Sequence, residues 1–168
     1  MHKQKYTMRT FFGAGQGVKR SAMRGAVAVE FALLLIPMLL LTFGVTEYGR
    51  ALYQYNTLVK TVRDSARLLS QHNPADAASY SLALDDARCL AVHGNTGCSG
   101  PPLAPGLTTG MVGIASTTTT TAAGTPITLV EVRITGYVFN FAFNPARLMG
   151  DAASTIPFSD IHATMRQL

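Results

Sequence analysis

The first 25 residues of the chain contain no aspartate or glutamate, although they hold six of its 14 lysines and arginines. From Ala51 onward, seven basic side chains are balanced by seven acidic ones. The formal net charge of +5 therefore arises at the N-terminal end. A protein that binds nucleic acid would need its basic residues on the folded part of the chain. This distribution of charge argues against that class of protein.

Cysteine is scarce, with only Cys89 and Cys98 present. The eight residues between them include several turn formers, so we predict a disulfide that closes this loop. In an oxidising compartment it would contribute about 2–3 kcal/mol by limiting the unfolded chain. A metal site that adds His93 to the two cysteines is the alternative, but the spacing matches no common zinc pattern and lacks an evident fourth ligand. We expect no metal and no cofactor.

The sequence also lacks a serine elbow, a metal-ligand pair at helical spacing and a glycine-rich phosphate loop. His72, His93 and His162 stand apart from such motifs. The adjacent carboxylates of Asp85 and Asp86 are typical of a solvated helix face rather than of an acid/base pair. No internal repeat is visible. These absences predict a protein that is not an enzyme.

One long apolar run is present, Ala26–Val45, and a single carboxylate, Glu30, interrupts it. At about 1.5 Å per residue it spans the roughly 30 Å hydrocarbon core of a bilayer, so we predict a transmembrane helix over residues 26–46. The basic leader, residues 1–25, favours a cytoplasmic N-terminus, with residues 47–168 outside the cytoplasm. A cleaved secretory signal is the alternative, but the run exceeds the roughly 7–15 residues of a signal core, and residues 42–46 offer no small-x-small cleavage site.

Two residues inside this run are unusual for lipid. An acidic side chain at the centre of a membrane helix costs about 2.5–3.5 kcal/mol, and somewhat less near one end, so Glu30 is expected to have a partner or to snorkel to the interface. Pro37 leaves a carbonyl unpaired and is expected to kink the helix.

Beyond the run, apolar residues recur at spacings of three and four, which predicts a helical stalk over residues 47–72 that continues the membrane helix. The stripe comprises Leu52, Tyr55, Val59, Val62, Ala66 and Leu69. Packing on the chain's own outer domain and a coiled-coil partner are both compatible with it. Tyr48, Tyr53 and Tyr55 are suited to the membrane interface.

The remainder predicts one modest α+β domain. Pro74 limits the stalk, and Asp76–Val92 is predicted to form a second, shorter helix that carries Leu82, Leu84, Ala87 and Leu90. Residues 99–126 are rich in Pro, Gly and Thr and predict a flexible loop. Strands are expected over about 127–168, interrupted at Asn144-Pro145. The predicted fold class is therefore α+β: a long N-terminal helix and a small C-terminal antiparallel sheet, one face of which the helix covers.

Two stretches carry a further pattern. The first is Arg24-Gly25-Ala26-Val27-Ala28-Val29-Glu30-Phe31-Ala32-Leu33. The second is Glu47, Tyr48, Gly49, Arg50, Tyr53 and Asn56, followed by Arg63-Asp64-Ser65-Ala66-Arg67. Together they resemble the TadE-like family, the minor pilin-like subunits of tight-adherence (Flp-type) pilus systems.

The resemblance implies a type IV pilin-like N-terminus. In such proteins a prepilin peptidase cuts after the glycine, here between Gly25 and Ala26, and a glutamate stands at the fifth mature position, here Glu30. The freed α-amino group of Ala26 would then be neutralised by Glu30 of a neighbouring subunit. The major Flp pilins are similar to a Glu-Tyr pattern at these two positions, and here Phe31 replaces the tyrosine. We expect Glu30 and Phe31 to contact subunits or the peptidase.

The expected function is that of a non-enzymatic minor pilin-like component, single-pass in the bacterial inner membrane. The resemblance implies as partners the prepilin peptidase, the inner-membrane assembly platform, and other minor pilins or the Flp pilin. No nucleic acid or small-molecule substrate is expected. Two alternatives remain: an uncleaved, membrane-anchored extracytoplasmic binding protein, and an anchored enzyme.

Overall fold

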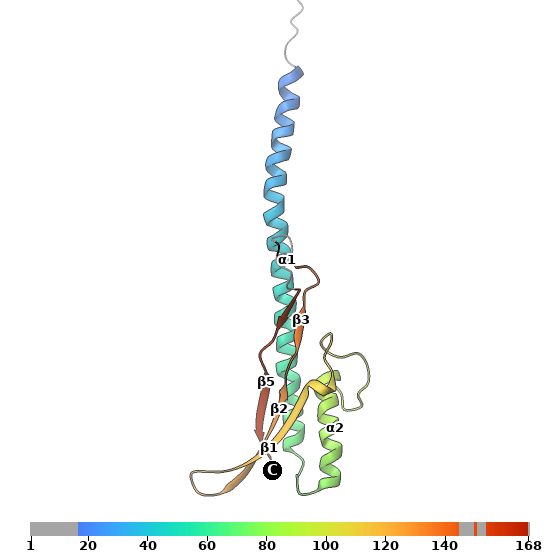
Figure 1. Cartoon of the computed structure of the whole chain (residues 1–168), viewed down its shortest axis with the longest axis vertical. Helices are drawn as coiled ribbons and strands as arrows, with labels where there is room; N and C mark the ends of the chain where they lie inside the picture. The colour runs from blue at the N-terminus through green and yellow to red at the C-terminus, as the bar shows by residue number, and fades with distance from the viewer. Residues whose placement is uncertain (1–16, 145–149, 151–153, 168) are drawn as a thin grey trace, which may run out of the picture. The chain divides into compact units, whose positions relative to one another are not determined.

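The computed structural model describes residues 17–144, 150 and 154–167, with side chains from residue 25 onward. Most of the basic leader therefore lies outside the described residues, as do Pro145 and the first residue of the predicted final strand, Ala153. The chain divides into two compact units, Met1–Thr42 and Phe43–Leu168. The α+β class is confirmed: α1 (Gly17–Ser70) and α2 (Ala77–His93) precede a short 3-10 turn and five strands (Figure 1).

In the first unit the described side chains of α1 are almost all exposed. The 18-residue window that defines the candidate membrane span has a mean hydropathy of 2.4 and is 0% buried, so this part of α1 is not the core helix of a globular domain. By length and composition it is suited to cross a membrane. Pro37 lies inside the helix without ending it.

In the second unit the same helix supplies the core. Leu58, Val62, Ala66 and Leu69 are fully buried against α2 and the sheet. The predicted stripe is thus confirmed in its lower part, but Leu52 and Tyr55 are 43% and 39% exposed. Before Leu58, the predicted stripe no longer coincides with the side of the helix that faces the core. The residues that cover α1 there leave part of its apolar face open to solvent. The helix ends at Ser70, two residues before the predicted end of the stalk.

Helix α2 forms close to where it was predicted. The Asp76 side chain accepts a hydrogen bond from the backbone N–H of Ser79, and Gly94 ends the helix in the left-handed conformation with φ 73°. Its buried face is made of small residues, Ala83, Ala87, Ala91 and Val92. Of the apolar residues that the predicted helix carries, Ala87 is buried, whereas Leu82 is 69% exposed. Alanines let α2 approach α1 closely enough for the Ser65 hydroxyl to donate to the Ala87 carbonyl at 2.9 Å.

A three-stranded antiparallel sheet, ordered β1-β2-β5, packs on these helices. Its strands are β1 (Val112–Thr120), β2 (Pro126–Ile134) and β5 (Ile161–Arg166), with Val130, Val132 and Ile134 buried. The flexible loop predicted over residues 99–126 was wrong across β1. The threonine run has no alternating hydrophobic pattern, yet threonine is β-branched and favours extended backbone, and each residue of β1 pairs with β2.

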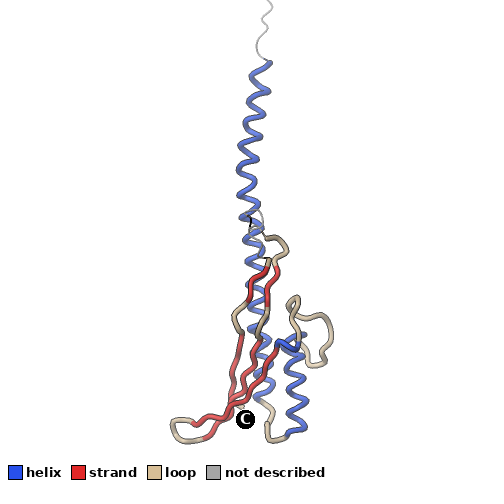
Figure 2. The backbone as a smooth tube through the Cα atoms, viewed as in Figure 1, coloured by secondary structure: helices blue, strands red, loops and turns tan. Residues whose placement is uncertain are grey.

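The region after residue 127 that was predicted to form strands is divided between two sheets. Gly136, with φ 71°, lies between β2 and β3 (Val138–Asn140), and β4 (Thr155–Pro157) precedes β5. Strands β3 and β4 form a separate two-stranded antiparallel sheet. Figure 2 shows that β3, which follows β2, and β4, which precedes β5, lie alongside the part of α1 that belongs to the second unit. These two strands are called the β3–β4 hairpin, and the hairpin region lies beside the first turns of α1 in the second unit.

Candidate functional site

The predicted processing residues lie on the fully exposed part of α1. Gly25, Ala26, Glu30 and Phe31 are all solvent-exposed, and Phe31 is among the large exposed apolar side chains. The Gly25-Ala26 bond lies inside the helix, and a Cβ added at Gly25 would meet no neighbour within 4 Å. Among the residues that the structure describes, Glu30 has no ion pair. These four residues are thus accessible to another molecule.

Two residues of the second pattern, the buried Glu47 and the partly exposed Arg50, form one anchor. The Glu47 carboxylate accepts two hydrogen bonds from Arg50 Nη1, at 2.8 and 2.6 Å, and is 5% exposed. It also accepts the backbone N–H groups of Ala142 and Phe143, each at 3.3 Å. The Arg50 guanidinium lies 5.4 Å from the centre of the Phe139 ring. This Glu47 anchor ties the end of the β3–β4 region to α1.

One turn farther along α1, Gln54 forms a second polar contact with the strands. The Tyr137 hydroxyl donates to Gln54 Oε1 at 2.8 Å and lies 3.2 Å from the carbonyl of Pro105. Burial raises the pKa of Tyr137, and the nearby Arg50 charge opposes that rise. Because the phenol stays protonated, it can act as the donor in this contact. The Glu47 anchor and the Gln54–Tyr137 contact both fix the strand region on the helix.

An apolar groove runs beside the Glu47 anchor. It consists of two adjoining cavities of about 250 and 270 Å³ that share Tyr48, Ala51 and Ile156. Apart from these, its walls are Gly44, Glu47, Leu52 and Tyr55 from α1, and Phe139, Phe141, Asn144 and Phe158 from the strand region. Tyr48 and Ile156 are exposed. Leu52 and Tyr55, the exposed residues of the predicted stripe, therefore line this groove instead of lying in the core.

A second groove, the polar groove, lies on a different face of α1. It measures about 490 Å³ and is lined by Tyr53, Asn56, Thr57, Lys60, Thr61, Asp64, Gly94 and Leu103. Tyr53 and Asn56 belong to the second pattern, and both are exposed. Gly94 and Leu103 come from the chain that leaves α2, so the groove opens where α2 ends. Its lining is mostly polar: the Thr57 and Thr61 hydroxyls donate to backbone carbonyls of α1.

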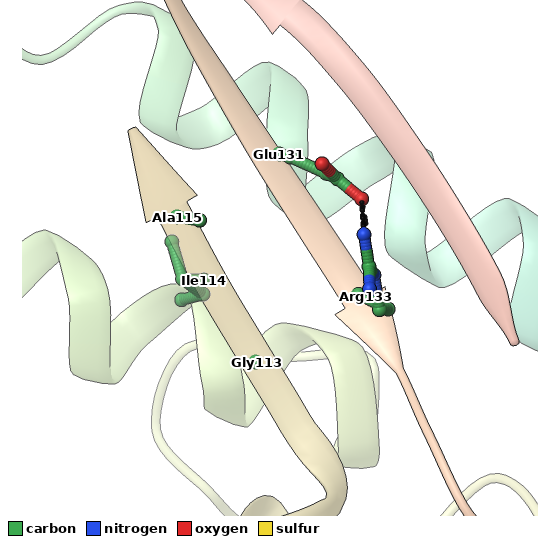
Figure 3. A pocket seen from close by; sticks show the side chains of 5 residues that line it. All are labelled: Gly113, Ile114, Ala115, Glu131 and Arg133. Atoms are coloured by element: carbon green, nitrogen blue, oxygen red, sulfur yellow. Dashed lines mark hydrogen bonds and ion pairs between the residues drawn. The ribbon is translucent and has the colours of Figure 1, made fainter. Parts of the chain in front are cut away.

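A third cavity, of about 250 Å³, lies on the sheet (Figure 3). Gly113 and Ala115 of β1 are paired with Arg133 and Glu131 of β2, and their small size leaves space beside the longer side chains. Arg133 Nη2 donates to Glu131 Oε1 at 2.6 Å. This bond and the Glu131 charge raise the pKa of the Arg133 guanidinium. The cavity holds an ion pair and two small residues, which provide no nucleophile.

The predicted disulfide between Cys89 and Cys98 is present. Since the sulfurs bond each other, the alternative of a metal site at these cysteines is not supported. Within the described residues no group of three or more His, Cys, Asp or Glu could hold a metal ion. The ring nitrogens Nδ1 of His72 and His93 lie 3.0 and 2.9 Å from the backbone carbonyls of Leu68 and Gly100. Asp85 pairs with Arg88 on an exposed helix face.

Breaking this disulfide is expected to lower the free energy of unfolding by about 2–3 kcal/mol, because the unfolded chain regains the entropy of the loop. Chemical denaturation of the full chain in detergent, with and without dithiothreitol, measures the difference. The double variant C89S/C98S should unfold like the reduced protein and should not respond to the reductant. A wild-type midpoint that the reductant leaves unchanged would contradict the assignment.

The structure separates the residues of the second pattern. Glu47 and Arg50 make the anchor, and Ala66 is buried in the core. Tyr48 lines the apolar groove, whereas Tyr53 and Asn56 line the polar groove. Gly49, Arg63 and Arg67 are exposed, and no contact among the described residues accounts for their place in the pattern. Gln54 and Tyr137 were missed, and a polar residue at a core-facing helical spacing was the one signal that could have indicated Gln54.

Residues 25–67 match the family model of TadE-like proteins. The match covers the described side chains of α1 up to the last turn, and it ends before α2 and the strands. No curated protein and no solved structure matches the chain significantly. The resemblance predicted from the sequence is thereby confirmed over this segment.

Proposed function

Starting from the TadE-like segment at residues 25–67, we propose that this Tad pilus-associated protein is a non-enzymatic minor pilin-like component of tight-adherence (Flp) pilus biogenesis. The observation that carries the proposal is the coincidence of the matched segment with α1. The helix is apolar and exposed in its first part, and in the second unit it is the scaffold on which the sheet packs. A helix that serves both as anchor and as scaffold suits a subunit that assembles with others.

The first part of α1 would anchor the protein in the bacterial inner membrane, with its N-terminus in the cytoplasm. Residues 47–168 would then lie outside the cytoplasm. The Cys89–Cys98 disulfide supports this orientation, because such bonds persist in oxidising compartments such as the periplasm. Partners would be the inner-membrane assembly platform and other minor pilins or the Flp pilin.

A prepilin peptidase would cut this chain between Gly25 and Ala26. The bond lies in a helix, so the peptidase must first unwind a turn. Glycine favours this step, because it stabilises a helix interior by about 1 kcal/mol less than alanine does. The exposed Glu30 would then meet the new α-amino group of Ala26 on a neighbouring subunit, and Phe31 would lie beside that contact.

Mass spectrometry and N-terminal sequencing of the protein from its native membrane test this processing. We expect a mature chain that begins at Ala26, and we expect the full-length chain in a Gly25→Leu variant and in cells without the prepilin peptidase. A Gly44→Leu variant is the matched control, because it makes the same change in the same helix away from the cut and should still be processed. A full-length chain in wild-type cells would instead favour the uncleaved, anchored binding protein.

A further inference from the structure

Six exposed residues of the TadE-like segment lie on one face of α1. Gly49, Tyr53, Asn56, Lys60, Arg63 and Arg67 follow one another at spacings of four, three, four, three and four. This spacing keeps side chains on one side of a helix and is the repeat of helix-to-helix contacts. All of them except Gly49 and Asn56 are large side chains, and Tyr53 is 72% exposed. Nothing described in the second unit covers this face.

Packing inside the chain does not account for these residues. Glu47, Gln54 and Leu58 point to the strands or the core, where Tyr137, Ala142 and the sheet hold them. Those partners lie outside the matched segment, which ends at residue 67. The face with Tyr53, Asn56 and Lys60 instead borders the polar groove of about 490 Å³. The matched segment thus contains a second face that the packing of the described residues does not require.

The charge of that face is positive. Lys60, Arg63 and Arg67 are exposed, and in the part of the chain that is described none of them has an ion pair. Asp64 is the one acidic residue among them. By contrast, Arg50, Arg88 and Arg133 are each paired with a carboxylate. Three unpaired cations at helical spacing are complementary to a partner with carboxylates at the same spacing.

We propose that the polar groove, together with Lys60 in its lining and the exposed Arg63 and Arg67 farther along α1, binds an acidic helix of another protein, laid along α1 where α2 ends. The groove is open there because Gly94 stops α2 and the chain turns away. This inference goes beyond the proposed function and does not rest on it, since the groove belongs to the second unit whether or not the chain is cut after Gly25.

A second copy of the chain and a lipid surface fit this face less well. On the described helices of the second unit the acidic residues Glu47, Asp64, Asp85 and Asp86 form no stripe at spacings of three and four, and Glu47 is buried. Lys60 lies fifteen residues beyond Val45, which is about 22 Å along the helix. That exceeds the headgroup layer of roughly 5–8 Å on each side of the hydrocarbon core.

The test uses the full chain in non-ionic detergent and a fluorescein-labelled helical peptide of Glu-Ala-Leu heptads, followed by fluorescence anisotropy. The triple variant K60E/R63E/R67E should bind it about 30-fold more weakly than wild type, as expected for three exposed charges that now repel. Arg166→Glu makes the same kind of change on the exposed side of β5 and should leave binding unchanged. Near-UV circular dichroism checks that each variant is folded.

Two further measurements use the wild-type chain, so they remain informative if the triple variant misfolds. Binding of the acidic helix should weaken about tenfold as salt rises from 50 to 500 mM. The same peptide with two central prolines, which keeps its charge but loses its helix, should bind at least tenfold more weakly. Equal binding of wild type and a folded triple variant, or of the helical and proline peptides, would overturn the proposal.

Two other outcomes would assign the face to a different occupant and would also overturn the proposal. One is a dimer of the full chain, seen by analytical ultracentrifugation, that the triple variant dissolves. The other is binding of the reconstituted chain to phosphatidylglycerol vesicles that the same variant abolishes. An N-terminus found uncut at Gly25 would leave the inference untouched, so the two proposals fail separately.

Discussion

Replacing Phe139 with alanine is expected to lower the free energy of unfolding of the second unit by about 3–5 kcal/mol. The ring is 0% exposed and lies in an aromatic cluster outside the main core. It stacks on Phe158 at 6.1 Å, meets Phe141 edge-on at 5.3 Å and receives the Arg50 guanidinium at 5.4 Å. Alanine removes all three contacts and leaves a cavity beside α1.

Denaturation of the full chain in detergent measures this loss. Near-UV circular dichroism is a suitable probe, because the chain has six tyrosines and eight phenylalanines but no tryptophan, and several of these rings pack around Phe139. Val138→Ala is the matched control: it lies on the same strand, but its side chain is 37% exposed and should cost under about 1 kcal/mol. Equal losses for the two variants would show that the aromatic cluster does not hold the hairpin on the helix.

Local patterns predicted the helices because the physical signals for helices are local. The spacing of Val62, Ala66 and Leu69 repeats within a few turns, and the Asp76 cap and the Gly94 stop lie at the ends of α2. These features depend on neighbours in the sequence alone. The membrane-like run was equally visible, because composition and length define it.

Features that depend on distant partners were not visible in this way. The threonines of β1 carry no hydrophobic alternation, and their strand exists because β2 pairs with them. Glu47 is a polar residue whose burial depends on backbone groups 95 and 96 residues away. Leu52 and Tyr55 fit the apolar stripe, yet the hairpin leaves them beside an open groove. The division of the TadE-like segment into buried and exposed residues therefore required the packed structure.

The candidate site shows the same division. A motif read from sequence could not distinguish Glu47 and Arg50, which hold the fold together, from Tyr53 and Asn56, which line the polar groove. All four lie within ten residues on one helix. Their roles differ because successive positions of a helix point to different neighbours, so the same segment both supports the strands and presents a free face.

Glu47→Ala is the second large loss that we expect, about 3 kcal/mol in the free energy of unfolding. The carboxylate has four hydrogen bonds, two from Arg50 Nη1 and two from the backbone N–H groups of Ala142 and Phe143. Removing one partner of a buried ion pair costs about 3–5 kcal/mol, and we take the lower end because the Arg50 side chain is 38% exposed. The same denaturation experiment measures it.

Glu131→Ala is the control that isolates burial from charge. It removes a carboxylate that also binds an arginine at 2.6 Å, but that pair lies on the exposed sheet surface. Exposed pairs contribute little, so the denaturation midpoint of this variant should stay close to wild type. Glu47→Gln keeps one oxygen for the backbone donors and should fall between wild type and Glu47→Ala. Similar midpoints for Glu47→Ala and Glu131→Ala would show that the anchor does not fasten the hairpin to α1. The hairpin would then be held on α1 by the aromatic cluster around Phe139 and by the Gln54–Tyr137 hydrogen bond.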